Sequence, residues 1–586
     1  MSSQTYHAIA HRKFKSLQSL IPKSWLLDPL PDPLPLDVRS LVSKSTVLTP
    51  DELSITSSYD VTSLSQLIHS RALTSEAVTT AFCKRAAIAQ QLTNCLSEIL
   101  FLPAIEQAHA LDAEYKHTGK TRGPLHGIPI SLKDTFNIKG YDSSIGIASL
   151  AGNPAKENAA LVDILLEQGA VPFCKTNVSQ TLMALDSHNH LFGRVLNPRN
   201  RRVTAGGSSG GEGALIAMRG SVLGIGTDIG GLGQEIGQLP GIDKLGLQGS
   251  AGLMTTSVRD CELFLKAIAD ANPWEKDPNV AFGSWEGQGE IGKKPLFGVL
   301  RADGITTPLP PVAKVLNETV EAVRNAGFEV VEINAPAFKK YHSLANSFFG
   351  IEGNNFPLDI LERTGEPLIP WLNARLRRKK HADLIQLSEL HVTKSALEKE
   401  MLQIWRDENG RMIDALICPV APHPVPEIDR WNGVGYTSAF VVLDYPAGTL
   451  PVRDISNGDL KDELPESEVL GGWDLRNRDL CKPSTFIPSV FRPSYHSYMF
   501  QTFVYPFSSM DAVGNPILQV YADPSETGHP DINDRKIYLN TKLSVQVVAP
   551  RLQERRLYQA MALIDEILRG ANSEIRARIQ SRSTVA

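Results

Sequence analysis

The alternation of apolar and polar positions predicts short strands separated by helices in the first half of the chain. Apolar residues occupy every second position from Ile128 onwards, which predicts a strand that ends at Lys133. Residues 170–174 and 221–227 predict two more strands, and residues 160–167 predict a helix before the first of these two. Strands that alternate with helices favour a layered α/β architecture.

A spacing of three and four residues between apolar positions predicts longer helices elsewhere. Thr74 can cap the start of one such helix, in which Val78 and Phe82 lie on one face. Residues 551–568 predict an amphipathic helix near the end of the sequence. Four alternating prolines at residues 29–35 cannot lie inside a helix, so they predict an extended connector after a small N-terminal helical piece.

Composition places the chain among ordinary globular proteins and excludes several classes of function. Hydrophobic residues make up 42% and charged residues 21% of the 586 residues, enough apolar material for a large core. The net charge of −5 argues against a nucleic-acid partner. No stretch reaches the roughly 18 consecutive apolar residues of a membrane span. We therefore expect a soluble, cytoplasmic protein with no membrane span.

The cysteines and histidines predict neither a metal site nor a disulfide framework. The six cysteines are scattered along the sequence and none forms a Cys-x-x-Cys pair. Reduced thiols in an intracellular compartment are the expected state. The fourteen histidines show no spacing suited to a metal, and no phosphate-binding or dinucleotide-binding pattern occurs. We expect no metal and no cofactor.

Three glycine-rich or strand-end motifs carry the candidate chemistry. They are Gly127–Asp134, which ends in Lys133-Asp134, then Gly206–Ala214, which holds Ser208 and Ser209, and then Gly226–Gly231. In this order and at this spacing they resemble the amidase signature family, in its fungal acetamidase-like branch. The resemblance implies a large α/β/α layered domain around a mixed β-sheet, with an N-terminal helical extension.

The same resemblance divides the chain into three parts. Residues 1–47 would be the helical extension and proline-rich connector, residues 48–572 the amidase signature domain, and residues 573–586 a tail. The family's activity is hydrolysis of a linear carboxylic amide to an acid and ammonia or an amine, through an acyl-serine intermediate. A small-molecule amide would be the substrate, and a homodimer is compatible with the family. Nitrogen scavenging and secondary metabolism are both compatible roles.

Carried over by position, the resemblance implies roles for individual residues. Lys133 would be the base, and must be neutral, so burial must lower its pKa. Ser208 would be the bridging serine that relays the proton, next to an unusual cis peptide bond. The backbone amides of Ile229, Gly230 and Gly231, with that of position 232, would form the oxyanion hole. Glycines there would let the backbone approach the substrate closely.

One position departs from the family in a way that matters for catalysis. The family has its nucleophilic serine directly after the third motif, whereas this sequence has Leu232, and a family block is missing from residues 232–249. Residues 480–530 hold the opposite anomaly, an aromatic-rich insertion. Three interpretations of this insertion stay open: it is a cover over a substrate channel, an insertion without a role, or translated non-coding sequence.

Three explanations of the departure stay open. The sequence is the product of a faulty gene model of an active amidase, or an inactive pseudo-amidase that at most binds ligands, or an enzyme that uses another hydroxyl. For the last, Ser209, Thr227 and Ser250 are the nearby candidates. It is the least favoured, because neither Ser209 nor Thr227 occupies the strand-end position that would face the oxyanion amides.

Overall fold

A computed structural model describes most of the chain. The described residues are 5–228, 239–247, 249–280, 285–287, 289–292, 294–334, 336–373, 375–430, 435–480 and 535–570. The helices are α1 (Tyr6–Ser19), α2 (Leu41–Lys44), α3 (Pro50–Ser58), α4 (Val61–His69), α5 (Ser75–Thr93), α6 (Phe101–Thr118), α7 (Ala160–Glu167), α8 (Gly210–Ala217), α9 (Val258–Asp270), α10 (Pro310–Asn325), α11 (Phe338–Phe349), α12 (Asn355–Glu362), α13 (Pro370–Asn373), α14 (Leu384–Met401), α15 (Gly435–Val442), α16 (Gly472–Asp479) and α17 (Glu554–Leu568).

Among the described residues, the strands form two five-stranded sheets and one two-stranded ribbon. Their bounds are β1 (Leu96–Ile99), β2 (Pro129–Lys133), β3 (Val171–Thr176), β4 (His188–Asn189), β5 (Gly193–Arg194), β6 (Leu223–Asp228), β7 (Ser250–Thr255), β8 (Leu296–Val299), β9 (Glu329–Glu332), β10 (Ala415–Pro419), β11 (Ala447–Asp454) and β12 (Lys542–Val548). The first sheet has the order β1-β3-β2-β6-β7 and the second β11-β12-β10-β8-β9. Each contains parallel and antiparallel pairs, so both sheets are mixed.

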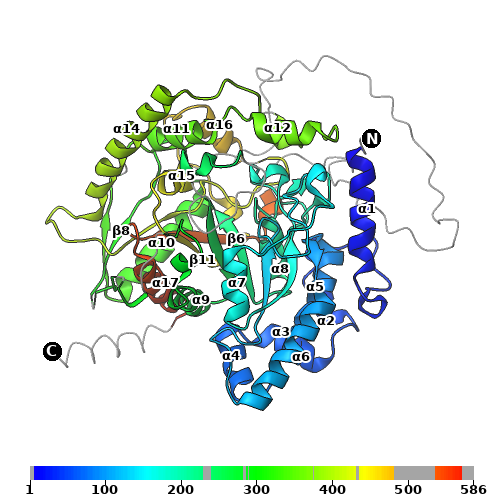
Figure 1. Ribbon diagram of the computed structural model, residues 1–586. Coiled ribbons are helices and arrows are strands. Elements are labelled where there is room, and N and C mark those ends of the chain that lie inside the picture. Colours follow the sequence, from blue (N-terminus) through cyan, green and yellow to red (C-terminus); the bar gives the residue numbers. More distant parts are fainter. Residues whose placement is uncertain are drawn as a thin grey trace.

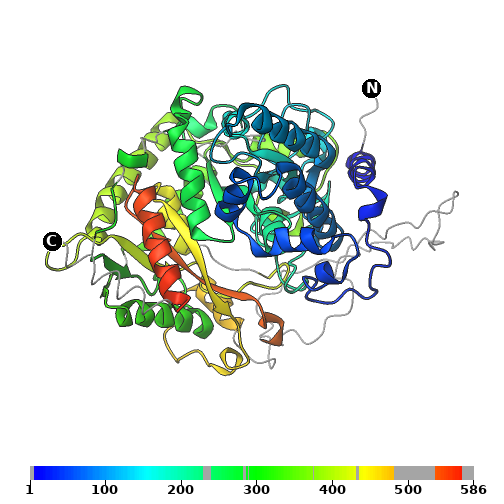
Figure 2. The same ribbon diagram turned by 90° about the horizontal axis from the view of Figure 1, so that it is seen from below.

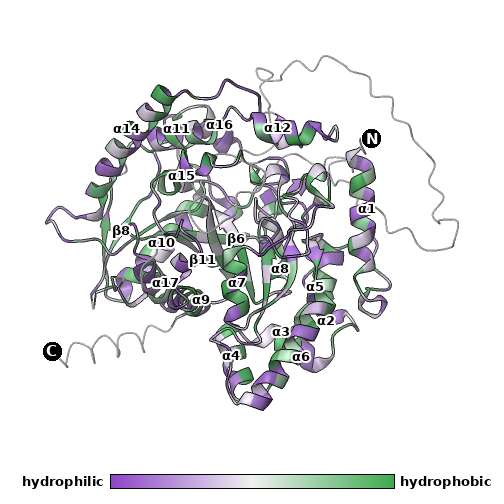
Figure 3. Cartoon of the chain, in the orientation of Figure 1, coloured by the Kyte–Doolittle hydropathy of each residue, from purple (hydrophilic) through white to green (hydrophobic). Residues whose placement is uncertain are grey.

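The first sheet has a hydrophobic layer on each face. Alternate residues of its central strands, such as Ile130, Leu132 and Ile225, pack with α4, α7 and α9. On the other face α5 and α8 cover the sheet, with Leu96 and Phe173 buried against them. Figure 1 shows α7 and α8 beside the first sheet, and Figure 3 shows that α7 is mostly apolar.

The second sheet repeats this layering with other helices. One face packs on α10 and α17, through Phe297, Ile417 and Val547 among others. The other packs on α11, α14 and α15, through residues such as Leu416 and Val548. Figure 2 shows α17, in red, lying along β11, in yellow. Helix α17 also contacts α9, which joins the layers of the two sheets.

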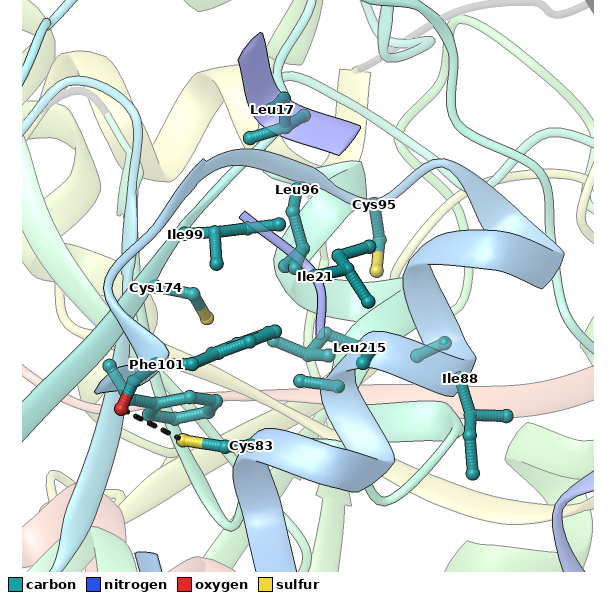
Figure 4. Close-up of a cluster of buried hydrophobic side chains, with 14 of the residues drawn as sticks. Leu17, Ile21, Cys83, Ile88, Cys95, Leu96, Ile99, Phe101, Cys174 and Leu215 are labelled. Atoms are coloured by element: carbon teal, nitrogen blue, oxygen red, sulfur yellow. Dashed lines mark hydrogen bonds between the residues drawn. The ribbon is translucent and has the colours of Figure 1, made fainter. Parts of the chain in front are cut away.

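The N-terminal segment belongs to the core of the first sheet. Leu17 and Ile21 are buried with Ile99 and Phe101 (Figure 4). The cysteines of this cluster are free, and Cys83 donates a weak hydrogen bond to the carbonyl of Phe101. Residues 5–47 therefore pack on the domain through apolar side chains of their own.

The predicted α/β class is confirmed, and so are the predicted elements near the motifs. The helix expected at 160–167 has those bounds, and Thr74 caps α5 by accepting a hydrogen bond from the amide of Ala77. The strands lie in two mixed sheets, whereas a single one was expected. Within the described part of the missing-block segment, residues 239–247 and residue 249, the chain forms only a short 3-10 helix at Ile242–Lys244.

Two further predictions can be compared with the structure only for the residues that it describes. None of the described helices is long and apolar enough to cross a membrane. The aromatic-rich insertion at 480–530 and the tail at 573–586 lie outside the described residues, apart from Leu480.

Candidate active site

Lys133 is the last residue of β2, and its side chain is fully buried. Its Nζ donates a hydrogen bond to Ser208 Oγ at 2.6 Å and another to Thr227 Oγ1 at 2.6 Å. Parallel pairing of β2 with β6 brings the carboxyl ends of the two strands to one edge, so Lys133 and Thr227 meet there. The structure thus brings together two residues that the sequence singled out, Lys133 and Ser208.

Ser208 is held by a loop that leaves no room for a side chain before it. The Gly207–Ser208 peptide bond is cis. A Cβ on Gly207 would lie 2.6 Å from both the carbonyl oxygen of Ala184 and the amide of Asp186. The hydroxyl of Ser187 donates to the carbonyl of Ser208 at 3.1 Å and accepts from the amide of Gly210 at 2.8 Å. The loop is therefore fixed on both sides of the serine.

Glu212 on α8 lies beneath the site and was not predicted. It is fully buried and accepts hydrogen bonds from Ser131 Oγ at 2.7 Å and Thr176 Oγ1 at 3.0 Å. Burial raises the pKa of Glu212 to about 8, although these hydrogen bonds and the nearby Lys133 lower it. A Cβ at Gly224 would lie 2.3 Å from Glu212 Oε2, so glycine at this strand position leaves room for the carboxyl group.

A second buried polar cluster supports the end of β2 from the other side. Asp134 accepts hydrogen bonds from Ser97 Oγ at 2.6 Å and the amide of Ile145 at 2.7 Å. The ammonium of Lys175 lies 3.9 Å from Asp134 Oδ1 and donates to the carbonyl of Asp142. Burial lowers the pKa of Lys175. Because Asp134 follows Lys133 directly, these contacts fix the backbone that carries the lysine.

The N-terminal helix reaches this cluster through one charged side chain. Lys13 on α1 forms ion pairs with Glu98 and, at 2.6 Å, with Asp142. Burial raises the pKa of Glu98 to about 7 against the attraction of Lys13. Nothing in the sequence linked Lys13 to the motifs, since its partners are 85 and 129 residues away.

The remaining predicted site residues divide into two groups. Ile229, Gly230, Gly231 and Leu232 lie outside the described residues, so the oxyanion hole and the nucleophile position stay predictions. Of the candidate hydroxyls, Ser209 contacts the backbone of Thr227 at 3.3 and 3.4 Å. The hydroxyl of Ser250 contacts the carbonyl of Ala251 at 3.5 Å.

No set of three or more His, Cys, Asp and Glu side chains suited to a metal ion occurs in the part of the chain that the structure describes. The described site consists of an amine, hydroxyls and a buried carboxyl group. Such groups can transfer protons and attack a carbonyl carbon.

Comparison with known proteins agrees with this chemistry. The Amidase family model matches residues 77–231 and 243–468, and its match is interrupted just after the third motif. The acetamidase of Emericella nidulans is 34% identical over 480 residues, covering 77% of this chain and 87% of the relative. An amidase of Gibberella moniliformis is 33% identical over 533 residues, covering 84% and 100%.

Similarity to solved structures extends over nearly the whole chain. A fatty acid amide hydrolase superposes with a TM-score of 0.75 at 25% identity and covers 97% of both chains. A structure described as an amidase gives a TM-score of 0.61. With its fold, its family match and its curated relatives in agreement, the chain belongs to the Amidase family, whose members hydrolyse amides.

Proposed function

We propose that this chain acts on linear carboxylic amides and that Lys133 and Ser208 are the proton-transfer pair of its site. The observation that carries the proposal is the 2.6 Å contact between Lys133 Nζ and Ser208 Oγ, made by a lysine with no solvent exposure. Burial penalises the charged form of an amine, and only a neutral amine can accept a proton. The acetamidase among the relatives supports a small aliphatic amide as substrate.

In this proposal the lysine accepts the proton of an attacking hydroxyl, and Ser208 passes a proton to the departing nitrogen. The amides of residues 229–231 stabilise the negative oxygen that forms on the substrate. The products are a carboxylic acid and ammonia or an amine. The scheme uses no cofactor. The free, buried cysteines support a reducing compartment, which we propose to be the cytoplasm.

Leu232 limits the amide turnover that we expect from this chain. An isobutyl group cannot attack a carbonyl, so we expect amide turnover far below that of a chain with serine at this position. The alternative function is that of a non-catalytic amide-binding protein, and it is Leu232 that favours it. Calorimetric binding of acetamide without any release of ammonia would support this alternative.

The proposal is tested by restoring the missing block. Residues 232–249 are replaced by the corresponding segment of the Emericella nidulans acetamidase, and ammonia release from acetamide is measured. We expect the grafted chain to hydrolyse acetamide and Lys133→Met in the grafted chain to abolish turnover. Lys139→Met, at an exposed lysine six residues further on, is the matched control and should leave the rate unchanged.

Two results would contradict the assignment. One is a grafted chain that folds, by circular dichroism, but releases no ammonia. The other is a grafted chain that keeps its rate after Lys133→Met.

A further inference from the structure

The buried Lys133 contacts two hydroxyl groups in the site. Ser208 Oγ and Thr227 Oγ1 both lie 2.6 Å from Lys133 Nζ. A lysine amine placed between two hydroxyls can take a proton from one and return it through the other. We infer that Thr227 is the hydroxyl that accepts the acyl group in this chain, in which position 232 is leucine; the inference rests on the function proposed above.

The place of Thr227 in the sheet favours this role. It is the last residue but one of β6, and Lys133 is the last residue of the parallel neighbour β2. Ligands of α/β sheets bind at the carboxyl ends of the strands, which is where both side chains lie. Of the two hydroxyls that contact the lysine, Thr227 is the one on a strand, whereas Ser208 lies in a loop.

Thr227 is also held in place and only partly buried. Its backbone is paired with Ala251 of β7 on one side and contacted by the hydroxyl of Ser209 on the other. A nucleophile on an ordered strand keeps its geometry better than one on a loop. The residue is half-buried, whereas the lysine behind it is fully buried.

The other hydroxyls of the region lack the contact that activates a nucleophile. Ser209 Oγ contacts the backbone of Thr227, and Ser250 Oγ the carbonyl of Ala251. Ser221 Oγ is buried and donates to the carbonyl of Leu223 at 3.0 Å. Since a hydroxyl is weakly nucleophilic without an adjacent base, the 2.6 Å contact with Lys133 separates Thr227 from these three.

The proposed reaction transfers the acyl group first to Thr227 and then to water. Thr227 Oγ1 bonds to the amide carbonyl carbon while its proton passes to the neutral Nζ of Lys133. A proton then reaches the amide nitrogen through Ser208, the carbon–nitrogen bond breaks, and ammonia or an amine leaves. Water attacks the resulting threonine ester, giving its proton to Lys133, and the threonine oxygen regains a proton as the acid departs. The net reaction is amide plus water to acid plus ammonia or amine.

Tryptic cleavage of the native chain separates the candidate hydroxyls. The experiment treats the full-length chain with a fluorophosphonate probe and locates the added mass by tandem mass spectrometry. Thr227 lies on the fragment 220–244, whose only other hydroxyl residue is Ser221, while Ser208 and Ser209 lie on the fragment 203–219. Ser250 lies on a third fragment, 245–259.

We expect the probe on Thr227, and we expect labelling to be lost in Lys133→Met and in Thr227→Val. Thr227→Ser keeps a hydroxyl in the same place, so it should keep both labelling and slow acetamide turnover. Ser250→Ala is the control and should behave as the native chain does. The valine variant is close in shape to threonine, and circular dichroism checks that it folds.

Label on the fragment 203–219, label on Ser221 or Ser250, or no label at all would overturn the inference. Unchanged acetamide turnover in Thr227→Val would do so too. None of these results affects the function proposed above, because that function is tested in the grafted chain, where a serine replaces Leu232.

Discussion

Glu212 is a carboxyl group enclosed by Ser131, Thr176 and the strand position of Gly224. Its pKa of about 8 lies well above the 4.5 of an ordinary glutamate, because burial disfavours the charge. The folded chain therefore keeps a proton that the unfolded chain releases above pH 4.5. The site is therefore supported by a group whose protonation is linked to folding.

The sign of this linkage gives a prediction. Between about pH 4.5 and 8 the folded state holds one more proton than the unfolded state at Glu212, so this residue's contribution to stability falls as pH rises. The slope is about 1.4 kcal/mol per pH unit for one proton. Glu212→Gln should remove this residue's share of the slope, as urea unfolding of both proteins at several pH values will show. Parallel curves for the two proteins would refute the linkage, and exposed Glu157→Gln is the control.

Sequence reasoning reached part of this residue-level description. The proximity of Lys133 and Ser208 followed from the family resemblance. The contact of Thr227 with Lys133 was missed, because periodicity does not give the register between two strands or the direction of a side chain at a strand end. Glu212 was missed because it lies in a run of small residues, with no apolar pattern to indicate that it is buried.

At the element scale, α8 connects the loop of Ser208 to the first sheet and depends on close backbone approach. A Cβ on Gly211 would lie 2.3 Å from the carbonyl oxygen of Asn177 and 2.7 Å from that of Cys95. A Cβ on Gly213, in the same helix, would meet its nearest atom at 3.7 Å. Position 211 therefore has no room for a side chain, whereas position 213 has room for one.

Alanine substitutions at the two positions should therefore have different effects on the free energy of unfolding. Alanine is a better helix former than glycine, so Gly213→Ala should leave the free energy of unfolding unchanged or raise it by up to about 1 kcal/mol. Gly211→Ala forces backbone atoms apart and should lower it by about 1–3 kcal/mol. Urea unfolding of both variants tests this. Equal effects of the two substitutions would mean that α8 does not pack as closely as described.

At the scale of the whole molecule, the two sheets and the N-terminal segment form one layered body. Sequence patterns predicted its α/β class and several element bounds, but not the division of the strands into two sheets, which depends on pairing between distant segments. The same limit applies to α1, whose ion pairs with Glu98 and Asp142 join the first helix to the cluster behind Lys133.

Breaking these ion pairs should destabilise the whole chain. Lys13→Ala leaves two carboxylates, each 6% exposed, without their cation, and removal of one partner of a buried pair costs about 3–5 kcal/mol. Lys15→Ala, at an exposed position of the same helix, should change stability by less than about 0.5 kcal/mol. Thermal unfolding compares the two variants. A small effect at Lys13 would show that α1 is held by its apolar contacts alone.

The long sequence separation between Lys13 and its ion-pair partners also affects the order in which contacts form during synthesis. Helix α1 is synthesised before its charged partners, which lie 85 and 129 residues after Lys13. The ion pairs of Lys13 therefore cannot form before Asp142 has been added to the chain, and the histidine, arginine and lysine side chains of this helix keep it hydrated in that interval. A fusion tag joined ahead of α1 therefore acts on a contact that is completed only 129 residues further into synthesis.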